Sequence, residues 1–538
     1  MIGRRFPLDL LAAVTPSTDV AARLAAMEAL DLIRRVSSSE EFTFKHALGR
    51  DALYASLLSG PRQALHLAIA REIEARNAGR LSEVADTLAH HYARADHKRK
   101  AVEYLALVGR KSLGIYSLEE AEHSLRTALT IARSEDSERM DREIATIMVD
   151  LAVVYYLQFR SAETITFIEP ELVRINKLGD AEQVPILLDL YGVALFTGCR
   201  FREAKRMADK ALAIAERLGN ARALAHARAG VIMMSIYIDP TPLGDFERFA
   251  RQAYVEAEQA ETGYMVVRMT MVIAMNYLHR GLTREGRRWA HQLMKFGRDR
   301  EDRRSLGMGL WLLGWFETVT GEYEAALAHG EECIATALAP YDRYQGQLIS
   351  GIAKLLLGRV AEGVAMLDGH RAHAIANGWQ YAALAAQAPL GVALLLGGDL
   401  RNGVWVLEAL IDRVEAELGY RAYADWTRIF LAEFYIALLQ GEKKPSLRVV
   451  LKNLLFLATA KRAAAKRAEA LLRCAMENPQ FSQHGAFRAR IDFNLGILLK
   501  ALGRKELALA HLRHGRDAAL MQEMPPLVAK IDVAIASM

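Results

Sequence analysis

The apolar positions along this chain do not alternate with polar ones over any convincing run of β-branched and aromatic residues, so the pattern does not favour strands. Similar apolar segments recur instead, each interrupted by small residues at fixed places. Four of them are LGWFETVTGEYEAAL (313–327), SGIAKLLLGRVAEGV (350–364), LGVALLLGGDLRNGV (390–404) and LGILLKALGRKELAL (495–509). Self-similarity of this kind predicts a repeat architecture.

Three small residues hold the same register in each segment: a glycine, a glycine seven residues later, and a small residue five residues after that. The first allows a second helix to approach closely, the second ends a helix in a left-handed conformation, and the third lies where the next helix crosses. The triplets are Gly314/Gly321/Ala326, Gly351/Gly358/Gly363, Gly391/Gly398/Gly403 and Gly496/Gly503/Ala508, with weaker copies at Gly192/Cys199/Ala204 and Ala274/Gly281/Gly286.

This register resembles the tetratricopeptide repeat, whose consensus has Gly at its eighth position and Ala at its twentieth. The resemblance implies an all-α, right-handed superhelix of helix–turn–helix repeats, with a concave face that binds a protein or peptide. Turns recur mostly about 40 residues apart, so the units are longer than the usual 34 residues. The units near 239 and 441 depart from the pattern. The interval from 441 to 503 predicts either an extra helix pair or a distorted repeat.

The first 115 residues lack the triplet and carry other motifs. They contain an F-x-F-x-H-A-L run (residues 42–48), an Arg-x-x-x-His pair (Arg62, His66), an H-H-Y element (90–92) and an Ala-Val-x-Tyr-Leu helix (101–105). These motifs resemble the segment that follows the nucleotide-binding domain of bacterial STAND-type AAA ATPases. The resemblance is greatest to class III adenylate/guanylate cyclases that carry an ATPase module and a C-terminal tetratricopeptide array.

The resemblance implies three parts: a winged-helix-like remnant (1–45), a helical linker arm (46–115) and a repeat superhelix (116–538). The chain would then be the C-terminal part of such a protein, as a separate gene or a truncated reading frame. Its function would be a non-catalytic interaction and sensor arm, which in full-length relatives regulates an attached ATPase or cyclase.

Catalysis is not expected from these residues. No Gly-Lys-Ser/Thr phosphate loop occurs, and no sheet is expected that would carry the metal-binding aspartates of a cyclase. We therefore expect no cofactor and no metal. Two alternatives stay open: a cyclase or STAND ATPase by family membership whose catalytic domains lie outside this chain, and a fragment of a large ATP-dependent transcriptional regulator. The latter class ends in a helix-turn-helix, whereas this chain ends KIDVAIASM.

Composition narrows the picture further. The 52% of apolar residues and the abundance of Ala, Leu, Glu and Arg favour a folded helical protein. A net charge of +5 over 538 residues is too weak a bias to imply nucleic acid. The three cysteines (Cys199, Cys333, Cys474) lie far apart, which suits a reducing, cytoplasmic location. The uncharged stretch 377–398 is rich in Ala and contains two Gln and a Pro, so a membrane span is not expected.

Several polar motifs admit both a site and a structural interpretation. His370 and His373 (with Asp368), and His511 and His514, each place two imidazoles on one helical face, but metal binding needs a third ligand. The H-H-Y element favours packing. The basic residues of 451–473 favour a solvated helix face, because no aromatic residues interleave with them as in a nucleic-acid platform. These residues are Lys452, Lys461, Arg462, Lys466 and Arg467.

The repeat frame gives one sharper candidate site. Groove-facing residues of the first helix fall near the second, fifth, ninth and twelfth positions of each unit. Counting from Gly314 gives Trp311 and Trp315, and counting from Ala274 gives Met271 and Met275. We expect these four side chains to share an apolar patch on the concave face that binds a partner. The competing interpretation is that the superhelix buries them as core.

Overall fold

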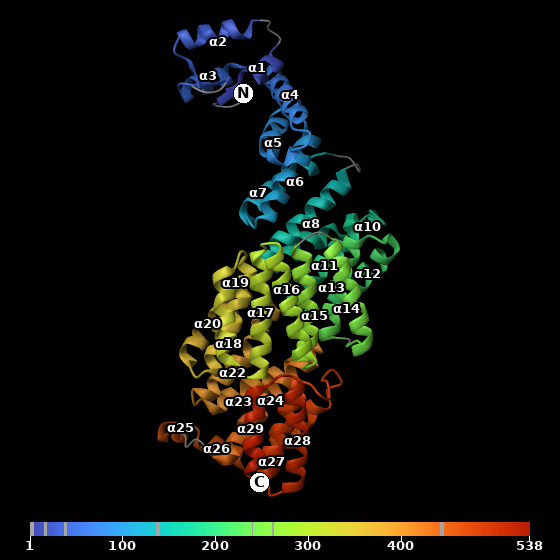
Figure 1. The fold of residues 1–538 in the computed structure, drawn as a ribbon, viewed down its shortest axis with the longest axis vertical. Coiled ribbons are helices and arrows are strands. Elements are labelled where there is room, and N and C mark those ends of the chain that lie inside the picture. The colour runs from blue at the N-terminus through green and yellow to red at the C-terminus, as the bar shows by residue number, and fades with distance from the viewer. Residues whose placement is uncertain are drawn as a thin grey trace. The chain divides into compact units, whose positions relative to one another are not determined.

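The computed structural model describes residues 5–15, 19–36, 40–135, 140–238, 240–260, 263–441 and 446–538. The chain divides into two compact units, Met1–Val154 and Tyr155–Met538. Helices dominate both units (Figure 1). No described helix is long and apolar enough to cross a membrane. The division at residue 154 does not coincide with the predicted boundaries at 45 and 115, which stay predictions.

Unit 1 begins with a small antiparallel sheet and two helices, a winged-helix-like arrangement. The sheet has the order β1-β3-β2, and Phe6 lies opposite Phe42. Phe6, Leu24, Ile33 and Phe42 form its core. The strands are three or four residues long, too short for an alternating pattern to show in the sequence. The elements are β1 (Arg5–Pro7), α1 (Leu8–Val14), α2 (Val20–Ala29), β2 (Ile33–Arg35) and β3 (Glu41–Phe44).

The remainder of unit 1 is helical. The partly buried carboxylate of Glu74 connects three of its side chains, because it accepts hydrogen bonds from the Tyr92 and Tyr104 hydroxyls and from the Lys100 ammonium. The elements are α3 (Ala47–Ser56), α4 (Ser59–Arg76), η1 (Leu81–Glu83), α5 (Ala85–Arg94), α6 (Lys98–Gly114), α7 (Leu118–Arg133) and α8 (Asp141–Leu157), whose last residues belong to unit 2.

Unit 2 is a stack of antiparallel helix pairs, a tetratricopeptide-like α-solenoid as predicted. Its first part comprises α9 (Ser161–Ile168), η3 (Glu169–Glu171), α10 (Leu172–Lys177), α11 (Gln183–Thr197), α12 (Phe201–Leu218), α13 (Ala221–Tyr237), α14 (Leu243–Gln259), α15 (Gly263–His279), α16 (Thr283–Asp299), α17 (Arg303–Thr320) and α18 (Tyr323–Thr336). Its second part comprises α19 (Pro340–Leu356), α20 (Val360–Ala376), α21 (Gln380–Ala385), α22 (Gln387–Leu396), α23 (Leu400–Asp412), η4 (Arg413–Leu418), α24 (Arg421–Gln440), α25 (Leu447–Lys452), α26 (Leu454–Met476), α27 (Ala486–Ala501), α28 (Lys505–Met521) and α29 (Pro525–Ala536).

The glycine register is confirmed. The second members of the four strong triplets have positive φ and follow α17, α19, α22 and α27: Gly321 (91°), Gly358 (84°), Gly398 (79°) and Gly503 (74°). The first and third members pack against one another, because a Cβ on Gly363 would lie 2.8 Å from the Gly351 carbonyl oxygen. The turn expected at 239 falls on a residue outside the described ones.

The long interval after residue 441 contains a distorted repeat. After the short α25, the 23-residue helix α26 packs against α24. A loop, 477–485, then leads into α27. No extra helix pair is present in the described part of this interval (446–503). Of the two expectations, the distorted repeat is therefore the correct one.

Within unit 2 the solenoid closes on itself, so that late repeats touch early ones. The Phe159 and Trp379 rings stack with centroids 3.9 Å apart. The backbone N–H of Ala486 donates to the carbonyl of Gly281 at 2.7 Å, and the Gln480 amide donates to the carbonyl of Ile236 at 2.9 Å. The concave faces of the helix pairs therefore meet across the superhelix axis.

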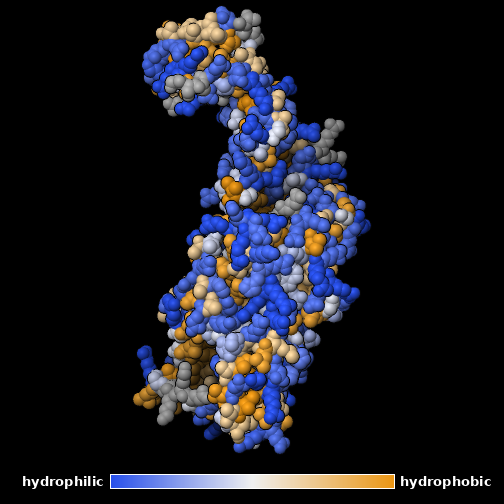
Figure 2. All heavy atoms as spheres, viewed as in Figure 1, coloured by the Kyte–Doolittle hydropathy of each residue, from blue (hydrophilic) through white to orange (hydrophobic). Residues whose placement is uncertain are grey.

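The outer surface of unit 2 in the view of Figure 2 is largely hydrophilic, with apolar side chains gathered over the C-terminal helices. The last helix pair contributes well-exposed apolar residues: Leu507, Leu520, Met521 and Val533.

Candidate functional site

All four residues of the predicted patch line one internal cavity of unit 2. Met271, Met275, Trp311 and Trp315 come from α15 and α17, as the repeat frame predicts. Trp311 is only 3% exposed, and the other three are partly buried. The competing interpretation, that the superhelix buries these side chains as core, therefore holds for Trp311, because closure of the solenoid encloses the concave face.

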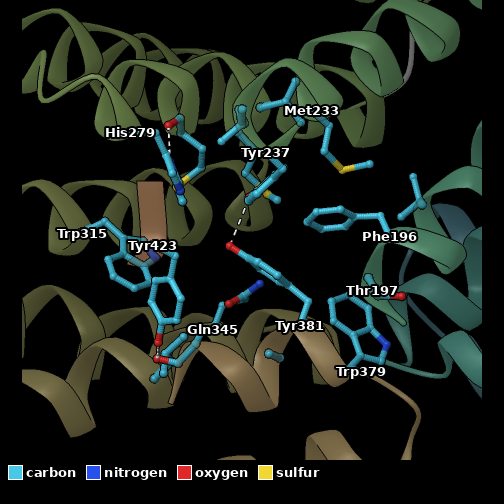
Figure 3. Close-up of a pocket in the computed structure, with 18 of the residues that line it drawn as sticks. Phe196, Thr197, Met233, Tyr237, His279, Trp315, Gln345, Trp379, Tyr381 and Tyr423 are labelled. Atoms are coloured by element: carbon cyan, nitrogen blue, oxygen red, sulfur yellow. Dashed lines mark hydrogen bonds between the residues drawn. The ribbon is translucent and has the colours of Figure 1, made fainter. Parts of the chain in front are cut away.

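This axial cavity has a volume of about 100 Å³. Its lining comes from the first helices of successive pairs, α8, α11, α13, α15, α17 and α19, and from α21 and α24 with the residues just before them (Figure 3). The wall is mainly aromatic. The aromatic residues are Tyr156, Phe196, Tyr237, Trp311, Trp315, Tyr341, Trp379, Tyr381, Tyr420, Tyr423 and Trp426.

Helical periodicity explains how each helix supplies a stripe of lining residues. Side chains four positions apart lie on one face, one above the other. Met271, Met275 and His279 form such a stripe on α15, and Trp311 and Trp315 form another on α17. Because the helix pairs stack side by side, these stripes lie next to one another and together form one cavity wall.

Hydroxyl groups of the cavity wall are paired with each other. The Tyr237 and Tyr381 hydroxyl oxygens lie 3.1 Å apart (Figure 3). His279 donates from Nδ1 to the Met275 carbonyl at 2.8 Å, and its Nε2 accepts from the Tyr420 hydroxyl. Burial lowers the pKa of His279 to about 4, so its imidazole is neutral near pH 7.

A buried ion cluster ties three of the lining helices together. The Arg268 guanidinium donates two hydrogen bonds to the Asp189 carboxylate, one of them at 2.6 Å, and His226 Nδ1 lies 3.0 Å from the same group. These residues belong to α15, α11 and α13 respectively. Burial alone would raise the pKa of Asp189, but the charge of Arg268 outweighs it and holds that pKa below its usual value.

The four tryptophans of the wall carry indole N–H groups that are buried without a hydrogen-bond partner. They are Trp311, Trp315, Trp379 and Trp426. Trp379 stacks on Phe159, and Trp426 stacks on His279 with centroids 4.9 Å apart. The rings are therefore fixed in place while their donors remain unused.

A second, smaller cavity of about 70 Å³ adjoins the first. Trp315, Tyr423 and Trp426 line both cavities and thus form a partition between them. At the second cavity, Arg490 donates to Glu433 at 2.8 Å.

Sequence reasoning missed much of the lining, for two different reasons. The same counting applied to Gly192 and Gly351 would have found Val193, Phe196, Gln345 and Leu348, which all line the cavity. Trp379 and Tyr381 escape that count because Ala386 divides the helix of their unit into α21 and α22. Tyr420, Tyr423 and Trp426 lie in or next to α24, whose unit lacks the triplet.

Three of the four paired histidines have hydrogen-bond partners, and the ring nitrogens of His370 are buried without one. His511 and His514 share one carboxylate, with their Nδ1 atoms 2.7 and 2.6 Å from Asp492. His370 is buried, and His373 Nδ1 lies 3.0 Å from the Tyr344 hydroxyl. Over the described ranges, no three His, Cys, Asp or Glu side chains converge as metal ligands.

The H-H-Y element and the basic stripe also have structural surroundings. His91 Nδ1 lies 2.8 Å from His66 Nδ1 in the core of unit 1. In the basic stripe, Lys461, Arg462 and Lys466 are exposed, as expected for a solvated helix face. Lys452 pairs with Asp399 at 3.0 Å, and Arg467 pairs with Glu408 at 2.8 Å.

No family model and no curated protein matches the chain. It is similar to many solved structures, among them the following three. A Rap protein complexed with competence and sporulation factor has a TM-score of 0.37 and 13% identity, covering 81% of this chain and 99% of that one. A monomeric IFIT1 mutant with m7Gppp-AAAA has a TM-score of 0.33 and 15% identity, covering 77% and 90%. The APC/C hetero-tetramer Cut9–Hcn1 has a TM-score of 0.31 and 13% identity, covering 90% and 95%.

Proposed function

We propose that the chain is a non-catalytic sensor and interaction module whose axial cavity takes up a compact apolar group. The observation that carries this proposal is the position of the cavity. Its wall is aromatic, and it lies where early and late repeats of unit 2 meet. Concave, mostly apolar cavities with a few polar groups are the usual form of ligand sites.

The position of the cavity suggests how a bound ligand would change the interaction of the chain with partner proteins. The cross-axis contacts, such as Phe159 with Trp379 and Tyr237 with Tyr381, also build the cavity wall. A ligand that binds only the closed arrangement stabilises it by RT ln(1 + [L]/Kd). The closed solenoid would thus become more stable when the cavity is filled, and partner proteins would sense that change.

The interaction role concerns the outer surface. The exposed apolar residues of α28 and α29, of which Val533 and Leu507 are the most exposed, are the kind of surface on which a protein docks. In the larger proteins that the first 115 residues resemble, such an arm would regulate the attached ATPase or cyclase. A peptide that places an aromatic side chain in the cavity is the alternative occupant.

The test is a titration of the purified chain with α-methylstyrene, an apolar planar probe, followed by calorimetry. We expect saturable one-to-one binding. Ala382 lines the cavity, so Ala382→Leu fills it and should abolish binding. Ala372→Leu, on the exposed side of α20, is the matched control and should bind normally. Circular dichroism checks that both variants are folded.

Two outcomes would contradict the proposed function. One is the absence of saturable binding to the unmodified chain. The other is binding that Ala382→Leu does not change, since the probe would then occupy another place. Hydrogen exchange adds an independent readout, because amides of α21 and α24 should exchange more slowly when the probe is bound.

A further inference from the structure

The indole N–H groups of the axial cavity specify what kind of ligand fits it. Trp311 and Trp379 are each 3% exposed, and their Nε1 donors have no partner. Trp315 and Trp426 carry the same unused donor. Leaving a buried donor unpaired costs free energy that a hydrogen-bond acceptor would recover. Buried polar groups without a partner in a folded protein require such an explanation.

The other polar side chains of the wall are already paired. The Tyr423 hydroxyl donates to the Leu384 carbonyl at 2.9 Å, and the Thr197 hydroxyl donates to the Ala194 carbonyl at 2.8 Å. The hydroxyls of Tyr237 and Tyr381 pair with each other. His279, Tyr420, Arg268, Tyr156, Tyr341 and Gln345 also have partners. The buried polar atoms of the wall that lack any hydrogen-bond partner are therefore the four indole N–H donors.

We propose, on the basis of the proposed function, that the ligand is a neutral, planar, ring-sized apolar molecule carrying a hydrogen-bond acceptor such as a carbonyl oxygen or ring nitrogen. One or more of the four indoles donates to that acceptor. A ligand with its own N–H or O–H donors would meet only hydroxyl and amide groups that already take part in hydrogen bonds, whereas an acceptor would meet four unused donors.

Charge and size agree with this class. A cation could gain from the aromatic faces, but no carboxylate is among the residues that line the cavity, and the neighbouring Asp189 is already paired with Arg268. A volume of about 100 Å³ is somewhat smaller than the engineered apolar cavity of about 150 Å³ that accepts benzene. A single substituted ring is therefore the size that fits with small adjustments of Met271 and Met275, which are flexible side chains.

The test compares two probes of nearly the same shape, acetophenone and α-methylstyrene. Acetophenone carries a C=O group where α-methylstyrene carries a C=CH₂ group. Binding of both is measured by calorimetry to the full chain and to four single variants, Trp→Phe at 311, 315, 379 and 426. A Phe keeps the ring and removes the donor. In at least one variant, acetophenone should bind about fivefold more weakly, because the loss of one net hydrogen bond reduces affinity by about that factor. The affinity for α-methylstyrene should be unchanged in the same variant.

Matched controls exist in the same unit. Trp405 is 67% exposed on α23, and Trp289 contacts Tyr254 away from the cavity. Trp289→Phe and Trp405→Phe should leave both affinities unchanged. A second readout uses ¹⁵N-labelled tryptophan: acetophenone should shift a cavity indole N–H resonance downfield, and α-methylstyrene should not. The Trp→Phe variants assign the resonances.

The outcomes separate this inference from the proposed function. If neither probe binds, the cavity is not a ligand site and both proposals fail. If both probes bind and every Trp→Phe variant weakens them equally, the cavity is a ligand site but the acceptor proposal is wrong. Tighter binding of phenyltrimethylammonium than of tert-butylbenzene, its neutral isostere, would also overturn it in favour of a cationic ligand.

Discussion

Replacing Asp189 by Asn removes the negative charge of the buried ion cluster with almost no change in shape. The Asp189 side chain is 1% exposed and the Arg268 side chain 3% exposed, so the substitution leaves a guanidinium charge without compensation in the interior. Losing one partner of a buried ion pair typically costs about 3–5 kcal/mol of unfolding free energy. We expect a cost in that range, because Asn can still accept only one of the two hydrogen bonds from Arg268.

The assay is urea unfolding at pH 7 followed by tryptophan fluorescence. All six tryptophans lie in unit 2, so the signal reports that unit alone. The matched control is Asp180→Asn, because Asp180 and Arg217 form an exposed pair at 3.1 Å, and such pairs contribute less than about 1 kcal/mol. The double variant Asp189→Leu/Arg268→Met should regain most of the lost stability, since it leaves no buried charge.

The reasoning is refuted if Asp189→Asn costs no more than Asp180→Asn, which would mean that water reaches the cluster. It is also refuted if the double variant is as unstable as the sum of its single changes, since the two groups would then not interact. Acid provides a related check. The pKa of Asp189 is lowered on folding, so its contribution is complete above about pH 4 and is lost only as pH falls below that value.

Three further predictions follow from the same structure. Trp311→Ala should lower the unfolding free energy of unit 2 by about 3–5 kcal/mol because the side chain is buried, and Trp315→Ala should lower it by less. Urea unfolding measures both losses, and equal losses would contradict this prediction. Burial lowers the pKa of His279 and of His370 to about 4, so each group contributes stability that is complete above about pH 6.5 and is lost as pH falls towards 4. The loss is about 2 kcal/mol each at pH 5, and an unchanged urea midpoint between pH 7 and pH 5 would contradict it. The purified chain should neither hydrolyse ATP nor form cyclic nucleotide, and turnover above a buffer blank that survives removal of contaminating proteins would disprove this.

The repeat architecture could be predicted because its determinants are local. A left-handed residue such as Gly358 and the small pair Gly351 and Gly363 are needed wherever two helices turn and pack closely, so they recur in register. The same locality placed Trp311 and Trp315 on the inner face. The three strands of unit 1 had no such signal, because strands of three or four residues carry almost no periodicity.

Closure of the solenoid could not be predicted from the pattern. It depends on pairs far apart in the chain, such as Phe159 with Trp379 and Gly281 with Ala486. The contacts between neighbouring repeats can be predicted from the sequence of a single unit. The pitch of the superhelix cannot, because it is the sum of small rotations between many successive units. Irregular units change that sum, and here the divided helix at Ala386 and the long α26 both lie in the half that returns to the start.

The same irregularities connect closure to binding. The divided helix brings Trp379 and Tyr381 onto the axis, and the unit without the triplet contributes Tyr420 and Trp426. A regular array would have presented the methionine and tryptophan stripes, with their counterparts from the other regular units, on an open groove. The departures from the repeat therefore turn an open groove into a closed cavity, and a cavity excludes water from the indole donors that an open groove would leave hydrated. Regularising the array, for example by a Gly triplet in the α24 unit, should reopen the axis and remove ring-sized ligand binding while the helix content stays the same.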